Sequence, residues 1–306
     1  MLVALAGGVG AARLLSGLVR AVDPASITAV VNTGDDVVLH GLHVSPDLDT
    51  VTYTLAGEIN PDTGWGLRDE TWQAMDTVRR YGGITWFNLG DRDLGTHLYR
   101  TQRLRDGATL TQATAEIVAA WGLRLRVLPV TDDRLETRLT VEGEGEIGFQ
   151  EYFVQRRHDV VVTDVRVDGA DSAKPGPDVL DAITSAERVI VCPSNPIVSI
   201  GPLLAVPGVR DALESRRDDT VAVSPIVAGA ALKGPADRLL RELGHESSVV
   251  GVARLYAPLA AALVVDEADA DLASAVEREG MRCVVAPTVM SSPDAAEALA
   301  RTVLDA

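Results

Sequence analysis

The sequence predicts an α/β fold in which helices cover both faces of a mostly parallel sheet. Short apolar runs of strand length alternate with segments of helical apolar spacing along all 306 residues, which is the pattern of strand–helix–strand units. The composition, 46% hydrophobic and 24% charged, is sufficient for a large core. No internal repeat, low-complexity tract or linker divides the chain, so we expect residues 1–306 to form a single domain.

The charge balance excludes several classes of partner. A net charge of −16, with no run of Lys or Arg, argues against nucleic acid and against anionic membrane surfaces. Positive charge comes almost entirely from Arg, because Lys174 and Lys233 are the only lysines. Arginine binds phosphate and carboxylate groups bidentately, so this composition is compatible with an anionic small molecule.

Cysteine usage and hydropathy predict a cytoplasmic protein. Cys192 and Cys283 are too few for a metal cluster or a disulfide framework, and we expect both to be buried thiols. The first residues lack the basic region of a signal peptide. The longest apolar region, 249–265, is interrupted by Arg254 and Pro258, so we do not expect it to span a bilayer.

The chain begins with a predicted strand, a glycine-rich turn and a helix. Leu2–Ala6 is an apolar run, Gly7-Gly8-Val9-Gly10 predicts a tight turn, and 11–22 has helical spacing. Free N–H groups at a helix start favour phosphate. The spacing matches neither the dinucleotide fingerprint nor a Walker loop, so this segment does not identify a ligand by itself. Arg13, in the first turn of the helix, could face an anion or solvent.

An acidic stretch follows the second predicted strand, Ile27–Val31. Its carboxylates belong to Asp35, Asp36, Asp47 and Asp49. At the carboxyl edge of a parallel sheet, such a loop could bind a hard divalent cation through oxygen ligands. A solvated acidic turn is the alternative, because Gly-Asp-Asp and Ser-Pro-Asp are ordinary turn sequences. His40 and His43 lie in the same stretch, where histidines are more often hydrogen-bonded loop residues than metal ligands.

Helices predicted over 51–59 and 69–81 lead to a second polar cluster. The cluster surrounds a glycine turn and a helix start, and it contains Asn88, Asp91, Arg92, Asp93, His97 and Arg100. Trp65, Trp72 and Trp86 lie nearby in a chain that is only 4% aromatic. These tryptophans are either core anchors of a helical insertion or the wall of a site for a flat ring.

The remaining elements continue the alternation. Further helices are predicted over 111–121, 178–186, from Ala236 onward and over 293–304. Further strands are predicted over 125–130, 137–142, 159–164, 188–192, 220–224, 259–266 and 281–286. The strand at 159–164 ends in a carboxylate, Asp164.

Two late loops complete a crevice at one edge of the predicted sheet. Ser194 and Asn195 follow a buried strand and lie between two prolines that fix the backbone, although turn chemistry explains this sequence equally well. The loop 225–235 carries glycines and Lys233. Right-handed crossovers place all four loops on one edge, where they suit a nucleotide diphosphate and a metal. Nucleophile-elbow and zinc-binding motifs are absent, so the sequence does not support a hydrolase or a zinc enzyme.

The ordered set of motifs resembles a known family. The motifs are Leu5-Ala-Gly-Gly-Val-Gly-Ala-Ala-Arg, Val31-Asn-Thr-Gly-Asp-Asp, Ser45-Pro-Asp-Leu-Asp-Thr, Leu89-Gly-Asp-Arg-Asp-Leu-Gly-Thr-His, Pro193-Ser-Asn-Pro and Ser224-Pro-Ile-Val-Ala-Gly-Ala-Ala-Leu-Lys-Gly-Pro. Together they resemble the 2-phospho-L-lactate transferase family of coenzyme F420 biosynthesis, whose actinobacterial enzyme is called phosphoenolpyruvate transferase. The likeness covers nearly the whole chain, and we expect no C-terminal glutamyl-ligase domain.

The resemblance implies a Rossmann-like three-layer αβα sheet with a helical insertion over about 51–122, in a homodimer. It also implies transfer of a phosphoenolpyruvyl or 2-phospho-L-lactyl group from a guanosine diphosphate donor to the ribityl hydroxyl of the deazaflavin Fo. The products would be dehydro-F420-0 or F420-0, together with GMP. It further implies in-line attack on phosphorus, in which Mg²⁺ would bridge the donor diphosphate and the metal and Arg would stabilise the developing charge.

Matching motifs assigns roles to individual residues. The implied catalytic groups are Asp35, Asp47, Asp49 and Arg92, and the implied Mg²⁺ ligands are Asp35 with Asp47 or Asp49. The implied donor contacts are Gly8, Val9, Gly10, Asn32, Ser194, Asn195, Ser224 and Lys233. The implied contacts of the deazaflavin are Asn88, Asp91 and Arg92.

Two alternatives stay open at this point. A related branch of the superfamily comprises non-catalytic regulators that bind a nucleotide sugar in the same crevice; the acidic stretch and Gly90-Asp91-Arg92-Asp93 favour the transferase. A nucleotide-binding oxidoreductase is disfavoured by the incomplete glycine fingerprint. An Arg-rich, Lys-poor composition hints at an actinobacterial source and hence at the phosphoenolpyruvyl donor, but no residue chooses between the two donors.

Overall fold

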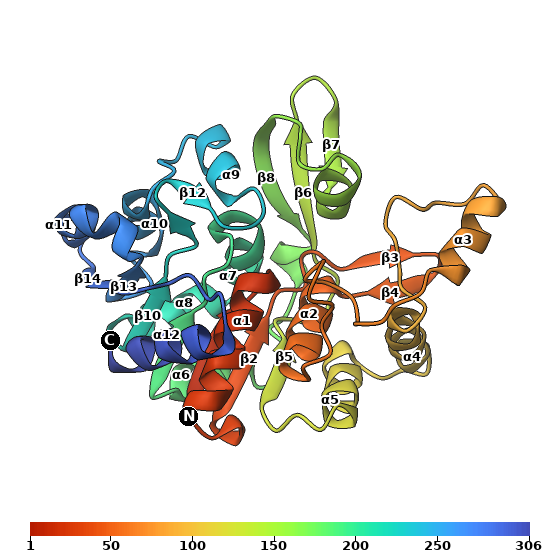
Figure 1. Cartoon of the computed structure of the whole chain (residues 1–306), viewed down its shortest axis with the longest axis horizontal. Helices are drawn as coiled ribbons and strands as arrows, with labels where there is room; N and C mark the ends of the chain where they lie inside the picture. The colour runs from red at the N-terminus through yellow and green to blue at the C-terminus, as the bar shows by residue number, and fades with distance from the viewer.

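Seven parallel strands form the central sheet of the computed structural model, which describes residues 1–306 (Figure 1). In chain order they are β1 (Leu2–Ala6), β2 (Ile27–Val31), β5 (Arg126–Pro129), β9 (Arg188–Val191), β10 (Thr220–Val223), β13 (Ala262–Val265) and β14 (Arg282–Val285). The predicted α/β fold with a parallel sheet is confirmed. These runs are apolar because parallel strands are buried on both faces.

The order of the strands places a crevice at the centre of the sheet. The spatial order is β14-β13-β10-β9-β1-β2-β5, so the chain moves outward from β1 to β5 and then returns to the other side of β1. Leu2 pairs with Ile27 on one side and with Arg188 on the other. The order reverses between β1 and β9, and ligands of doubly wound sheets bind beside the carboxyl ends of the strands at such a point.

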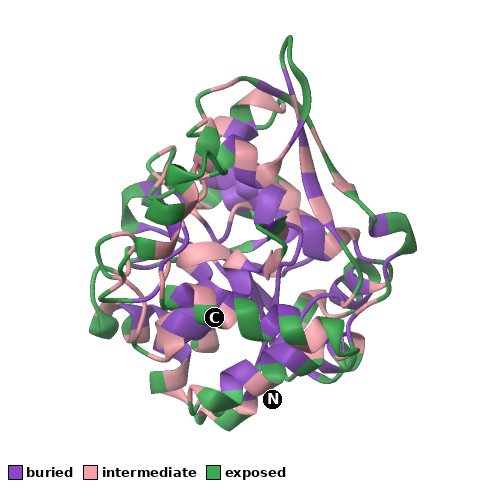
Figure 2. Ribbon diagram, turned by 90° about the vertical axis from the view of Figure 1, so that its right-hand side faces the viewer, coloured by how far each residue is buried: buried purple, intermediate pink, exposed green.

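Two apolar layers cover the sheet. On one face α1 (Gly8–Ala21) packs against α12 (Pro293–Asp305) and α2 (Pro46–Leu55), with Leu14, Leu18 and Leu299 in the core. The other face is covered by α6 (Val179–Ser185), α7 (Gly201–Ala205), α8 (Val209–Ser215) and α10 (Val249–Tyr256). The buried residues therefore concentrate along the sheet and the inner sides of these helices (Figure 2).

An insertion lies between β2 and β5. It contains the hairpin β3 (Val37–Leu39) and β4 (Leu42–Val44), then α2, α3 (Gln73–Arg80), α4 (Asp93–Arg105) and α5 (Leu110–Ala120). A small core of Leu39, Val44, Met75 and Leu89 holds the hairpin to α3 and α4. Two expectations for this region were wrong: α2 begins at Pro46 and not at 51, and α3 begins at Gln73, not at 69, where the backbone of Asp69 is left-handed (φ 54°).

A second, antiparallel sheet stands beside the central one, at the top of Figure 1. It has the order β7-β6-β8, formed by β6 (Glu136–Val141), β7 (Gly145–Gly148) and β8 (Val162–Asp168). The predicted strand at 159–164 is shifted, and Asp164 lies in the middle of β8, exposed and away from the crevice. β6 alternates buried and half-buried residues, which is the pattern of an antiparallel sheet with one solvated face.

The last elements complete the chain around β10 and β14. They are β11 (Ile226–Val227), β12 (Ala230–Ala231), α9 (Ala236–Glu242) and α11 (Ala273–Arg278). No single helix is long and apolar enough to cross a membrane; one pair, Pro196–Ala205 with Val209–Ser215, meets the length and composition test only jointly and is bent by 97°.

Candidate active site

The glycine segment joins the ends of β1 and β9. α1 begins at Gly8, so the predicted tight turn is in fact the first turn of the helix. The Gly7 N–H donates to Ser194 Oγ over 3.2 Å. A Cβ on Gly10 would lie 2.3 Å from the carbonyl oxygen of Pro193, which explains the need for glycine there. This first turn contains no acidic residue and has no side-chain cap, so its N–H groups favour an anion.

Asn32 and Asp47 form the centre of the crevice. Asn32, buried at the end of β2, donates from Nδ2 to Asp47 Oδ2 over 2.9 Å, and its Oδ1 accepts from the Gly34 N–H. A Cβ on Gly7 would lie 3.0 Å from Asp47 Oδ2, so this carboxylate lies against the start of α1. Burial raises the pKa of Asp47 to about 6 in spite of the Asn32 hydrogen bond. Asp47 thus lies in the first turn of α2 and faces the start of α1.

Asp35 is a second buried carboxylate beside Asp47. Burial raises its pKa well above the ordinary value, and the negative charges of Asp47 and Asp36 raise it further. Its Oδ1 is buried and has no hydrogen-bond partner. Two buried carboxylates, one with an oxygen that has no hydrogen-bond partner, offer the oxygen ligands that a hard divalent cation takes. These residues therefore fit Mg²⁺.

Asp49 is separated from that pair. It lies two residues after Asp47 in α2, about 200° around the helix. Its carboxylate accepts from Arg100 Nη1 over 3.1 Å and from Arg100 Nη2. His97 Nδ1 lies 3.6 Å from Asp49 Oδ2, and His97 Nε2 lies 3.3 Å from Asp93 Oδ2. The donor atoms of Asp49, Asp93 and His97 lie within 4.8 Å of one another, so this buried group could also hold a metal ion.

The two late loops differ in position: Ser194 and Asn195 lie in the crevice, and Lys233 lies at the surface. Ser194 is buried at the switch point, and Asn195 caps the following turn through Oδ1 while its Nδ2 is buried without a partner. The Ser224 hydroxyl bonds only to the backbone of Ile226, within its own turn. Lys233 is exposed, and its Nζ reaches the carbonyl of Thr63 over 3.5 Å.

Two of the residues expected near the deazaflavin make contacts within the insertion instead. Asp91 accepts from the N–H groups of Gln73 and Ala74 and so holds the start of α3. Arg92 bonds to the carbonyl of Arg68 and lies 3.4 Å from Glu58. Asn88 is different, because its Oδ1 is buried without a partner.

A cavity of about 530 Å³ opens beside Asp35. Its polar lining includes Asp35, Asp36 and Arg138, and its aromatic lining consists of Trp86 and Phe149. Gln150, also in the lining, donates to the Asp35 carbonyl over 2.9 Å. The sequence did not predict that β6 and β7 contribute to this site. The residues between these strands form a polar, exposed turn, and nothing in that turn indicates that residues of the strands line a cavity.

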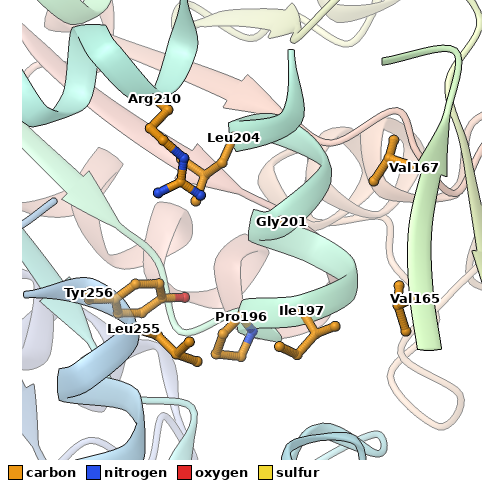
Figure 3. Close-up of a pocket in the computed structure, with 9 residues that line it drawn as sticks. All are labelled: Val165, Val167, Pro196, Ile197, Gly201, Leu204, Arg210, Leu255 and Tyr256. Carbon is orange, nitrogen blue, oxygen red and sulfur yellow. The ribbon is translucent and has the colours of Figure 1, made fainter. Parts of the chain in front are cut away.

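A second cavity, of about 280 Å³, lies between β8 and the segment after β9 (Figure 3). Val165 and Val167 form one wall and Ile197 and Leu204 the other, with Tyr256 at one end. None of the predicted site residues lines it. This cavity is therefore separate from the acidic group.

Comparison with known proteins identifies the family of this chain. Residues 2–301 match the family model described as 2-phospho-L-lactate transferase CofD. The phosphoenolpyruvate transferase of Streptomyces griseus subsp. griseus is 47% identical, over 99% of this chain and 97% of that protein; the one from Thermobifida fusca is 44% identical, also over 99% and 97%. A UPF0052 family protein from Bacillus halodurans has a TM-score of 0.63 at 17% identity, covering 99% of this chain and 98% of its own, which supports the fold. The chain belongs to the CofD family, the 2-phospho-L-lactate transferases.

Proposed function

We propose that this protein transfers a phosphoenolpyruvyl or 2-phospho-L-lactyl group from a guanosine diphosphate donor to the ribityl hydroxyl of the deazaflavin Fo, with release of GMP. The observation that carries the proposal is the buried pair Asp35 and Asp47 beside the start of α1, at the reversal of strand order. Relatives named phosphoenolpyruvate transferase favour the phosphoenolpyruvyl donor. The family assignment further supports a cytoplasmic homodimer.

Asp35 and Asp47 would hold Mg²⁺. When bound, the ion supplies positive charge that neutralises the donor diphosphate and stabilises the transition state. The uncapped N–H groups of Gly8, Val9 and Gly10 would bind the diphosphate. Ser194 and Asn195 lie across the crevice and would hold the guanosine side of the donor, with Lys233 adding charge from the loop before α9.

The acceptor fits the cavity of about 530 Å³. Trp86 and Phe149 offer aromatic faces for a flat ring, and Asp35 connects this cavity to the donor side. Asn88 remains a candidate contact because its carbonyl oxygen lacks a partner, whereas Asp91 and Arg92 are occupied. We therefore place the ring against the cavity walls. Asp91 and Arg92 instead hold the segments of the insertion together.

The transfer is a substitution at phosphorus. The acceptor hydroxyl oxygen forms a bond to the β-phosphorus, the one that bears the three-carbon group, while the bond from that phosphorus to the GMP oxygen breaks. Asp36 also lines the cavity and would orient or deprotonate the hydroxyl.

Fluorescence of the free deazaflavin provides the test. Purified protein is titrated into Fo with Mg²⁺, and the enolpyruvyl and lactyl guanosine donors are then added separately while GMP is measured. Saturable binding and GMP release with one donor support the proposal and identify the donor. Absence of both, together with tight binding of a nucleotide sugar, would assign the protein to the regulators instead.

A further inference from the structure

We infer that Arg100 is a positioning residue for the metal site and acts through Asp49. The inference rests on the proposed function, because that function assigns the metal to Asp35 and Asp47. Arg100 lies in α4, outside the crevice, and its side chain is 1% exposed. It is the largest fully buried side chain in the protein.

The Arg100 guanidinium holds both ends of the segment that carries Asp47. Nη1 and Nη2 donate to the two carboxylate oxygens of Asp49 in the first turn of α2. Nη1 also donates to the carbonyl oxygen of His43 in β4, over 3.4 Å. Residues 43 and 49 flank Asp47, so one rigid planar group fixes the strand before α2 and the helix start after it.

The same helix reaches Asp36 through β4. The His43 N–H donates to Thr101 Oγ1 over 2.7 Å, so the residue after Arg100 fixes the same strand. His43 Nε2 and Ser45 Oγ in turn bond to Asp36 Oδ2 over 2.9 and 2.6 Å. Asp36 is adjacent to Asp35 in the chain. Helix α4 thus controls the backbone on both sides of the proposed metal ligands.

This geometry makes Asp49 an anchor for Arg100 and not a ligand. Both of its carboxylate oxygens accept from the guanidinium, whereas Asp35 Oδ1 is buried without a partner. A cation held by Asp49, Asp93 and His97 would lie directly against the Arg100 charge, which opposes binding there.

The test compares two arginines of α4. Arg100→Lys keeps the charge but loses the planar fork. Arg103→Lys is the matched control, because Arg103 lies one turn later and forms a bidentate pair with Glu116 over 2.8 and 2.9 Å, away from the acidic segment. Binding of Mn²⁺ alone is measured by electron paramagnetic resonance, and the kinetic constants for Mg²⁺, donor and acceptor are measured in parallel.

We expect Arg100→Lys to weaken Mn²⁺ binding and to raise the Mg²⁺ requirement about tenfold, without change in the KM of the acceptor. Arg103→Lys should retain the wild-type values. Wild-type Mn²⁺ affinity in Arg100→Lys, or equal weakening in Arg103→Lys, would overturn the inference. Failure of the wild-type protein to transfer either donor would refute the proposed function and leave the Mn²⁺ comparison interpretable.

A second variant covers the case in which Arg100→Lys does not fold. The double variant Asp49→Asn with Arg100→Gln removes both buried charges and keeps a hydrogen bond between the side chains. Mn²⁺ binding within about tenfold of wild type supports the anchor role, because a neutral pair still holds α2. Weakening of Mn²⁺ binding by more than about tenfold would overturn the inference.

Discussion

Asn32 Nδ2 donates to Asp47 Oδ2 over 2.9 Å and thereby joins the end of β2 to the first turn of α2. The contact is buried, and the same Asn32 side chain accepts from the Gly34 N–H. It therefore fixes the position of Asp47 relative to Asp35.

The metal location can be tested with three isosteric variants. Asp35→Asn and Asp47→Asn should each lower kcat at least about 100-fold, because charge compensation at the transferred phosphoryl group is lost. His97→Gln changes the other candidate group and should stay within about tenfold of wild type. GMP release is measured, with circular dichroism to confirm folding. Loss of activity in His97→Gln alone would move the metal to Asp49, Asp93 and His97.

Without divalent cations, the free energy of unfolding should decrease as the pH rises from 4 to 6. The pKa of Asp47 is about 6 in the folded protein against an ordinary 3.8, so the folded state binds more protons than the unfolded state in this window. The free energy of unfolding consequently decreases as the pH rises, by about 3 kcal/mol for this group. Urea unfolding in EDTA measures it.

Asp47→Asn should remove the contribution of this group to the pH dependence, leave the contribution of the raised pKa of Asp35, and make the cation-free protein more stable than wild type at pH 8. The exposed Asp164 serves as the control, and Asp164→Asn should leave the pH profile unchanged. A flat wild-type profile across this window would contradict the raised pKa.

Two glycines should respond oppositely to alanine. A Cβ on Gly10 would lie 2.3 Å from the Pro193 carbonyl oxygen, so Gly10→Ala should destabilise the protein by about 2 kcal/mol or more and raise the KM of the donor. Gly95, in α4, has no atom within 4 Å of the corresponding position, so Gly95→Ala should stabilise by about 1 kcal/mol. Thermal unfolding and donor kinetics measure both. Unchanged stability in Gly10→Ala would show that β1 and β9 are less closely packed than described.

The acceptor cavity can be tested with two tryptophans. Trp86 lines the cavity, and Trp86→Leu should raise the KM of Fo about tenfold, equivalent to about 1.4 kcal/mol, with little effect on the donor. Trp65 pairs with Trp72 outside the cavity, so Trp65→Leu should leave that KM unchanged. Fluorescence titration of Fo gives the affinities. Equal effects from both variants would argue against this placement.

The two lysines provide an internal comparison for the donor. Lys233→Gln should raise the KM of the donor about tenfold and reduce its dependence on salt, because one cation near the diphosphate is lost. Lys174 is exposed and bonds through its backbone to Asp133, so Lys174→Gln should have no effect. Steady-state kinetics at two ionic strengths give the KM of the donor for both variants, and equal values for the two would argue against a role of Lys233.

Much of the fold could be predicted because parallel strands have a simple signature. Leu2–Ala6 and Ile27–Val31 were predicted with their correct bounds, since continuous apolar runs reflect burial on both faces. The start of α1 was placed too late because Gly8 is in the left-handed region (φ 72°), which resembles a turn. The hairpin at 37–44 was missed because its strands are only three residues long.

The sequence left open which of Asp47 and Asp49 lies beside Asp35, and the reason is physical. Ser45-Pro46 is an ordinary helix start, with Pro in the first turn. Once α2 begins there, the helical period separates Asp47 from Asp49 and assigns them to opposite sides. The partner of Asp49 is Arg100, 51 residues later. Only the tertiary packing of α2 against α4 could supply that information.

The central position of β1 also affects the order of folding during synthesis. β1 pairs with β2 early in the chain, but its other edge pairs with β9, whose residues are made about 160 positions later. At typical synthesis rates this edge waits about 10–30 s for its partner. The crevice lies on that late edge, so incomplete chains present an unpaired apolar strand at the position of the future site. The part of the proposed donor site that contains Ser194 and Asn195, directly after β9, can therefore form only once β9 has docked.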